Sequence, residues 1–413
     1  MIWSLTDLFI INLLNYNKAM KIKNNIYWIG ELNPLLRKFD IVMETQWGTS
    51  YNSYLIKDEL GDVIVDTVHE RFCDSFINKI NEISNVNNIK YLIVSHCEPD
   101  HSGSIATLLK LNPNIQILCS FTSEKFLKDI TNLNNLNIHV VTNNEKLKLK
   151  NHTFKFFLAP NLHWPDTMFT YLENEKMLFT CDFLGSHFCE PRIFDYNISY
   201  PQKYSEALEH YYYAIMSPFK RFILKGLEIV NSLNPEYVLN SHGPILTRNH
   251  YLPIVLKKYY ELTNKKSELV VPVFYVSAYQ LTEQLALSIV EGIKECNFKP
   301  LLINLETFDF NQAIEIINNS SKFFIGSPTI NRKALPIMIN LIANIDLINA
   351  NGKSCLVFGS YGWTGEAKDQ LISLLKSFRI MTSDLSFNVK FKPTKDDLIK
   401  AKSNAIKFLK ENC

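Results

Sequence analysis

Hydrophobic and polar positions follow two different patterns in the two parts of the chain. Short apolar runs bounded by turn residues predict strands, and segments with an apolar residue every three or four positions predict amphipathic helices. In the N-terminal part the predicted strands are 26–28, 54–56, 63–65, 91–94, 115–119, 154–158, 177–181 and 237–240. Helical spacing occurs at 71–83, 104–111 and 202–232. This interleaving predicts an α/β sandwich of two sheets with outer helices.

A regular alternation of strands and helices begins after a polar segment at 262–268. The predicted strands are 270–276, 299–304, 323–325 and 354–358, and the predicted helices are 284–295, 311–318, 335–343 and 368–377. Strand and helix alternating at this spacing predict a doubly wound parallel sheet. We therefore expect an N-terminal extension at 1–19, a first domain at 20–265 and a second domain at 269–413.

Net charge and cysteine spacing limit the partners and the cellular compartment that the sequence predicts. A formal net charge of +2 gives no reason to expect a nucleic acid or an anionic membrane as partner. The eight cysteines form no CxxC pair, which argues against a zinc ribbon or a disulfide framework and predicts a reducing, cytoplasmic location. Residues 1–19 are apolar, but this stretch is too short to span a bilayer, so we expect a disordered extension or an over-long start of the reading frame.

The most informative chemistry follows the predicted strand 91–94, where residues 95–101 read Ser-His-Cys-Glu-Pro-Asp-His. Single His or Asp residues follow three later strands. Polar side chains at the carboxyl ends of strands are typical of α/β sites, and mixed imidazole and carboxylate ligands suit iron, zinc or manganese rather than calcium. The predicted ligands are His96, Glu98, Asp100, His101, His163, Asp182 and His242. For the neighbouring Asp166 and His187 we expect a structural role, and the alternative is that either orients a metal ligand.

The order and spacing of these ligands resemble the metallo-β-lactamase-like domain of flavodiiron proteins. The resemblance includes 48–54 and runs from about residue 20 to the C-terminus. It implies an αββα sandwich with one iron on His96, Glu98 and His163. It also implies a second iron on Asp100, His101 and His242, with Asp182 bridging the two.

Glu98 bears on the class of reaction. Zinc hydrolases of this fold usually have His-x-His-x-Asp-His, and Glu98 stands where the second His would be. Three carboxylates and one bridging hydroxide would nearly balance two Fe(II) ions, and oxygen ligands also suit Fe(III). The ligand set therefore favours a redox centre over a hydrolytic one.

The second domain resembles flavodoxin, which implies FMN as its cofactor. Three loops carry the match: Ser277, Ala278, Tyr279, Gln280, Leu281 and Thr282; Ser327, Pro328, Thr329, Ile330 and Asn331; and Ser360, Tyr361, Gly362, Trp363 and Gly365. The first loop would hold the phosphate with backbone N–H groups and hydroxyls, and the other two would flank the isoalloxazine.

The phosphate loop departs from the family pattern. Gln280 and Leu281 stand where the family usually has Gly and Asn. A positive φ costs Gln about 1 kcal/mol relative to Gly. We therefore expect either weaker FMN binding or a different path for this loop.

The resemblance implies an oxidoreductase that passes electrons from FMN to two irons and reduces O2 to water, with reduction of NO to N2O as the alternative. It implies a head-to-tail homodimer, or a dimer of dimers, that brings the FMN of one subunit beside the irons of the other. Because no rubredoxin or flavin-reductase module precedes Cys413, we expect an external donor: rubredoxin, an NAD(P)H-dependent reductase or F420H2.

Two other classes of protein stay open from the sequence. One is a dinuclear-zinc hydrolase with an added flavodoxin-like module, which the altered phosphate loop favours and Glu98 disfavours. The other is an electron carrier whose metal site is only structural. The presence of seven candidate ligands argues against this class.

Overall fold

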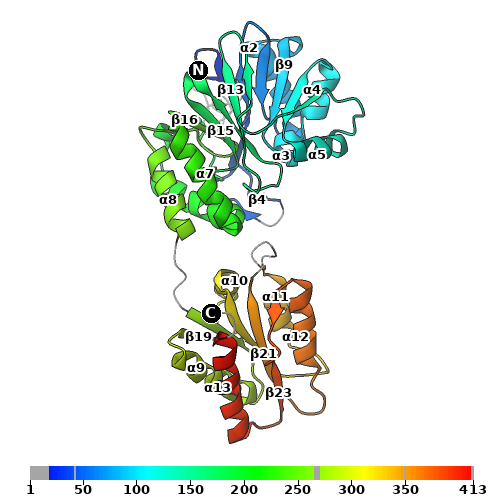
Figure 1. The fold of residues 1–413 in the computed structure, drawn as a ribbon, viewed down its shortest axis with the longest axis vertical. Coiled ribbons are helices and arrows are strands. Elements are labelled where there is room, and N and C mark those ends of the chain that lie inside the picture. The colour runs from blue at the N-terminus through cyan, green and yellow to red at the C-terminus, as the bar shows by residue number, and fades with distance from the viewer. Residues whose placement is uncertain are drawn as a thin grey trace, which may run out of the picture. The chain divides into compact units, whose positions relative to one another are not determined.

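The computed structural model describes residues 18–40, 43–264, 270–345, 347, 350 and 352–410. The chain divides into two compact units, Met1–Asn264 and Lys265–Cys413 (Figure 1). Of the predicted N-terminal extension, residues 1–17 lie outside the described residues. Within the described ranges, no helix has the length and apolar character needed to span a bilayer.

Two mixed sheets form the centre of the first unit. The first sheet has the order β1 (Met20–Lys23), β2 (Ile26–Trp28), β7 (Tyr54–Ile56), β8 (Asp62–Val65), β9 (Ile89–Val94), β10 (Gln116–Cys119) and β11 (Ile138–Val140). The second has the order β12 (Lys146–Lys148), β13 (Thr153–Leu158), β14 (Met168–Leu172), β15 (Met177–Cys181), β16 (Tyr237–Asn240) and β17 (Leu246–Thr247). The remaining strands of this unit form two short antiparallel pairs: β3 (Glu31–Asn33) with β6 (Thr49–Tyr51), and β4 (Lys38–Phe39) with β5 (Met43–Glu44).

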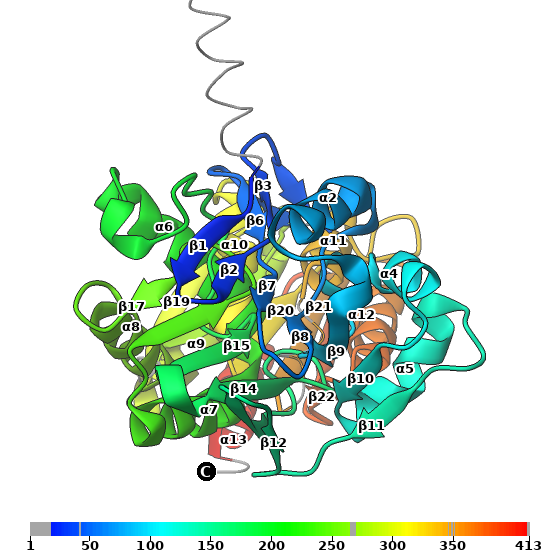
Figure 2. The same cartoon turned by 90° about the horizontal axis from the view of Figure 1, so that it is seen from above.

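Helices cover both outer faces of these sheets, as Figures 1 and 2 show from two directions. The helices on the first sheet are α2 (Cys73–Ile83), α4 (Ile105–Leu111) and α5 (Phe121–Thr131), and those on the second are α6 (Pro201–Tyr211), α7 (Lys220–Leu233) and α8 (Leu252–Asn264). A separate apolar core lies between the two sheets and includes Trp28, Phe156 and Phe179. Three cores between four layers confirm the predicted αββα sandwich.

The predicted helical region at 202–232 is confirmed, but it is not one continuous α-helix. Helix α6 ends at Tyr211, a π-helical turn spans Tyr212–Met216, and a short 3₁₀ turn at Ser217–Phe219 precedes α7. Pro218 occupies this 3₁₀ turn and has no backbone N–H to continue an α-helical ladder. The apolar spacing continues through the break because α6 and α7 pack on the same sheet.

The second unit is a single parallel sheet with helices on both faces. Its strands are β18 (Val270–Tyr275), β19 (Lys299–Asn304), β20 (Lys322–Gly326), β21 (Ser354–Tyr361), β22 (Met381–Thr382) and β23 (Phe387–Lys390). Helices α9 (Leu281–Glu295) and α13 (Lys395–Lys410) cover one face, and α10 (Phe310–Asn319), α11 (Pro336–Ala343) and α12 (Glu366–Ser377) cover the other.

The order of these strands is diagnostic. It runs β19-β18-β20-β21, with β22 and β23 both paired to β21, and every pairing is parallel. This is the 2-1-3-4-5 order of the flavodoxin-like fold, and it confirms the predicted doubly wound sheet. The order reverses between β18 and β20, so a ligand crevice is expected at their carboxyl ends.

Candidate metal centre

The segment that follows β9 carries four of the predicted ligands. His96 and Glu98 lie on the turn that leaves the strand, and Asp100 and His101 lie in the short helix α3 (Pro99–Ser102). Pro99 starts this helix, where its fixed φ favours a helical turn. None of the four ligand side chains belongs to a residue more than 9% exposed.

The other three ligands come from the second sheet. His163 lies between β13 and β14, Asp182 directly follows β15, and His242 follows β16. Strands β15 and β16 are parallel, so their carboxyl ends meet at one edge. The register shifts at Cys181, whose φ of 54 lies in the left-handed region that a non-glycine residue adopts at a cost. This local distortion directs Asp182 into the cluster.

Asp182 is at the centre of the cluster, and its Oδ2 atom faces the first group of ligands. This oxygen is 2.9 Å from His96 Nε2 and 3.3 Å from His163 Nε2. Glu98 Oε2 lies 3.1 Å from the same nitrogen of His163. One atom each from Glu98, His163 and Asp182 therefore lie within 4.8 Å of one another.

The other carboxylate oxygen of Asp182, Oδ1, faces a second group. It lies 3.1 Å from His101 Nε2 and 3.4 Å from His242 Nε2. Asp100 Oδ2 is 3.3 Å and 3.1 Å from the same two nitrogens. The structure thus brings all seven predicted ligands together, as two groups that share Asp182.

The electrostatics of the cluster fit a bound cation. Burial would lower the pKa of His101, but the Asp100 and Asp182 carboxylates outweigh it and raise this pKa to about 10. Burial also opposes the charge of Asp182, yet His101 and His96 hold the pKa of Asp182 well below its usual range. Positive charge is therefore strongly favoured between these carboxylates.

A buried polar atom of the cluster that has no partner also fits a bound metal ion. Asp100 Oδ1 is buried and makes no hydrogen bond within the described ranges. A buried polar atom without a partner costs about 1–3 kcal/mol, and coordination of a metal would remove that cost. The donor set of nitrogen and oxygen atoms suits iron.

Residues outside the ligand set hold His242 in position. His242 Nδ1 is 2.7 Å from the Ser50 carbonyl oxygen, so its N–H donates there and Nε2 is left to face the cluster. Thr49 Oγ1 lies 3.3 Å from the same Nδ1 and 2.9 Å from His187 Nδ1. Burial and the neighbouring His242 hold the pKa of His187 well below its usual range.

Asp166 and Cys97 do not join the ligand groups among the described residues. Asp166 Oδ2 accepts hydrogen bonds from the Cys97 backbone N–H at 2.9 Å and from Ser123 Oγ at 3.0 Å. Cys97 is buried, and its thiol donates to the Ser123 carbonyl at 3.8 Å. Asp166 therefore fixes the ligand-bearing turn to α5.

The sequence placed Thr49 and Ser50 in the segment 48–54 that carries the resemblance, without a role for either, and it did not single out Asp40. Burial, followed by the carboxylates of Glu98 and Asp100, raises the pKa of Asp40 to about 6. These residues belong to the turn-rich segment before β7, where polar residues are common. Only a folded structure brings them to the metal centre.

The three predicted flavin loops lie at the carboxyl ends of β18, β20 and β21 in the second unit. Thr282 Oγ1 is 2.9 Å from Ser360 Oγ, which joins the first loop to the third. The Thr329 N–H donates to the Ser360 carbonyl at 2.9 Å, which joins the second loop to the third. Two aromatic side chains here are almost fully exposed, Tyr279 at 92% and Trp363 at 94%. The loops thus form one edge with hydroxyls and open aromatic faces, which fits a flavin and its phosphate.

Sequence comparisons decide the family. The flavo-diiron protein FprA2 of Clostridium acetobutylicum is 44% identical over 93% of this chain and 97% of the relative. The chain belongs to the flavodiiron protein family. An anaerobic nitric oxide reductase flavorubredoxin of Klebsiella pneumoniae is 30% identical over 92% of this chain and 79% of the relative.

Domain and structure comparisons agree with this family. Residues 49–243 match the ODP family beta lactamase, and residues 273–403 match flavodoxin. The solved rubredoxin oxygen:oxidoreductase of Desulfovibrio gigas superposes with a TM-score of 0.72 at 26% identity, over 95% of this chain and 99% of that one. The relatives are oxidoreductases, and this flavodiiron protein is one too, which sets aside the hydrolase and the electron carrier. Family membership implies a diiron centre and FMN, which the residues present fit.

Proposed function

We propose that this flavodiiron protein reduces O2 to water with electrons that FMN relays to two irons. The observation that carries the proposal is the position of Asp182 between two ligand groups, with Oδ2 at 2.9 Å from His96 and Oδ1 at 3.1 Å from His101. A carboxylate in this position can bridge two metals.

The ligand roles follow from the two groups. His96, Glu98 and His163 would hold one iron, Asp100, His101 and His242 would hold the other, and Asp182 would bridge them. Iron held by these residues would supply the redox chemistry that reduction of O2 requires. Glu98 keeps an oxygen ligand where hydrolases of this fold have His, which supports a redox reaction.

Differences in exposure indicate where a substrate would approach. The side chains of His163 and Glu98 are 19% and 12% exposed, whereas those of Asp182 and His101 are 2% and 0% exposed. A diatomic gas would therefore approach from the side of His163 and Glu98.

Reduction of either gas also needs a donor that supplies electrons to FMN. The solved relative from Desulfovibrio gigas is called a rubredoxin oxygen:oxidoreductase, which makes a rubredoxin the first candidate, with an NAD(P)H-dependent reductase or F420H2 as alternatives. We propose that the protein works as a head-to-tail homodimer, or a dimer of such dimers, because electron transfer needs FMN near iron. A cytoplasmic location fits the seven free cysteines among the described residues.

Reduction of NO to N2O is the second candidate. The observation that favours it is the Klebsiella pneumoniae relative, whose name specifies nitric oxide reductase and which matches 92% of this chain. The ligand groups serve either gas equally well, so a direct comparison of the two rates is needed.

An electrode assay separates the two gases. Purified protein with reduced rubredoxin receives either O2 or NO, and both rates are recorded under identical conditions. We expect faster consumption of O2, with no peroxide released. A faster rate with NO would assign nitric oxide reduction instead, and activity with neither gas would contradict both assignments.

A further inference from the structure

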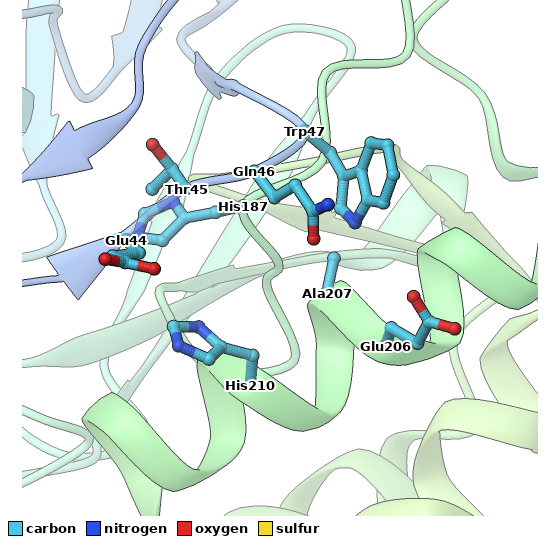
Figure 3. Close-up of a pocket in the computed structure, with 8 residues that line it drawn as sticks. All are labelled: Glu44, Thr45, Gln46, Trp47, His187, Glu206, Ala207 and His210. Carbon is cyan, nitrogen blue, oxygen red and sulfur yellow. The ribbon is translucent and has the colours of Figure 1, made fainter. Parts of the chain in front are cut away.

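The first unit contains a second polar site, separate from the seven ligands of the metal centre. It is a pocket of about 230 Å³, and Figure 3 shows the side chains around it. The lining residues are Glu44, Thr45, Gln46, Trp47, His187, Glu206, Ala207 and His210. They come from the segment at the end of β5, from the loop after β15 and from α6.

His187 is the buried histidine of this pocket, and its hydrogen bonds determine which ring nitrogen carries the proton. The Thr49 hydroxyl can donate to the Ser50 carbonyl at 3.3 Å, and His187 Nδ1–H can then donate to Thr49 Oγ1 at 2.9 Å. This leaves a lone pair on Nε2. That atom is buried in a residue only 3% exposed, and it has no hydrogen-bond partner among the described residues.

The same arrangement is found in His242, whose Nδ1–H donates to a carbonyl while Nε2 faces the diiron site. A histidine that binds a metal typically donates its other ring N–H to an oxygen. His187 is therefore prepared as a ligand in the same way, yet it belongs to neither ligand group of the diiron centre.

The other side chains of the pocket complete a donor set. His210 and Glu44 are exposed and line the pocket on the same side as His187, whereas Glu206 lies at its other end (Figure 3). Two imidazoles and one carboxylate are the three protein ligands of many zinc sites.

We propose that this pocket binds a divalent transition-metal ion, with His187 Nε2, His210 and Glu44 as ligands. Their ligand atoms do not all lie within 4.8 Å of one another, unlike those of the diiron groups. The exposed side chains of His210 and Glu44 can close on the ion by changing rotamer. The site is thus one fixed histidine with two mobile ligands.

An ion bound in this pocket would affect the diiron centre. The rings of His187 and His242 lie 5.0 Å apart, and Thr49 Oγ1 is within 3.3 Å of Nδ1 of His242. An ion on His187 would restrict the motion of Thr49 and, through it, of His242. This coupling rests on the proposed diiron assignment, whereas binding of the third ion does not.

Zinc retention tests the site. The iron- and FMN-loaded protein is incubated with Zn2+, passed over a chelating resin and analysed for zinc, iron and FMN. We expect one retained zinc ion per chain with the iron content unchanged. His210→Ala and Glu44→Gln should each bind zinc at least roughly tenfold more weakly, since even loss of an outer partner of a ligand costs that much.

His250→Ala is the matched control, because His250 is an exposed histidine of the same unit that does not line the pocket. It should retain zinc like the unmodified protein. The proposal is overturned if no zinc is retained, if zinc replaces iron, or if the two pocket variants retain zinc as well as the control does. Unchanged iron and FMN contents in the variants show that they are folded.

Discussion

Asp182 is the residue on which the metal centre most depends. It is 1% exposed, and each of its oxygens faces a different pair of histidines. Among the described residues, no other carboxylate of the seven candidate ligands contacts histidines of both groups. Its loss should therefore affect both metals at once.

Asp182→Asn should lose both irons and reduce turnover by more than roughly 100-fold, because the amide has no charge and only one oxygen donor. FMN content should stay unchanged, since the flavin loops belong to the other unit. Iron analysis and the flavin spectrum measure these two results. Asp129→Asn, at an exposed position of α5, is the control and should keep its iron and its activity. If Asp182→Asn also keeps both, the bridging role is refuted.

The seven candidate ligands could be singled out because His and carboxylate residues gather on the segments that follow four predicted strands. The structure brings these residues together, and their role as ligands stays a prediction. Thr49 and Ser50 could not be predicted in the same way. They precede β7 in the sequence and reach His242 only when β6 packs beside the turn that follows β16. Both residues lie in the three-residue strand β6, and nothing in the local sequence indicates a contact with a histidine almost 200 positions later.

At the scale of elements, length did not decide which ones were predicted. The three-residue strands β2 and β7 were predicted, whereas helices α5, α8 and α13 were missed. Strand β12 has only Lys146, Leu147 and Lys148, which is too short to show a period of two. Helices α6 and α7 looked continuous because both present apolar residues to the second sheet. The π-helical turn between them depends on packing that the sequence does not display.

Helix α7 packs closely on the ligand-bearing loops through Gly226. A Cβ atom at this position would lie 2.8 Å from Leu162 Cδ1 and 3.0 Å from Phe183. Gly226→Ala should therefore destabilise the first unit by about 1–3 kcal/mol through overpacking, offset by about 1 kcal/mol of helix propensity. The transition midpoint in thermal unfolding measures the net loss.

Lys225→Ala, one position earlier on the exposed face of α7, is the control and should change stability little. A Gly226→Ala protein that is as stable as this control would show that the helix can shift without cost.

The phosphate loop before α9 holds two non-glycine residues in the left-handed region, Tyr279 at φ 55 and Gln280 at φ 61. Gln280→Gly should tighten FMN binding about fivefold, since glycine removes about 1 kcal/mol of backbone strain from the bound loop. Quenching of FMN fluorescence measures the dissociation constant. Lys294→Ala, at the far end of α9, is the control and should leave the dissociation constant of FMN unchanged. If Gln280→Gly binds FMN no more tightly than the unmodified protein, the loop carries the same strain with and without FMN.

At the scale of the whole molecule, the proposed head-to-tail dimer predicts that defective subunits rescue each other. Asp182→Asn lacks the irons, and Ser277→Glu should lack FMN because its carboxylate would repel the phosphate. If these two variants are mixed and allowed to exchange subunits, half of the dimers should contain one subunit of each. In each mixed dimer the FMN of the Asp182→Asn subunit lies beside the irons of the Ser277→Glu subunit, so about a quarter of the unmodified activity should return.

Mixing Asp182→Asn with His242→Ala is the matched control, since both defects lie in the same unit and no intact pair can form. Activity that does not return in the first mixture would contradict the head-to-tail arrangement.

The most direct test of the central claim is the metal and flavin content of the purified protein. We expect two irons and one FMN per chain, because Asp182 lies between two pairs of histidines and one flavodoxin-like unit follows. A colourless protein that holds two zinc ions and no flavin would contradict the assignment of a diiron oxidoreductase.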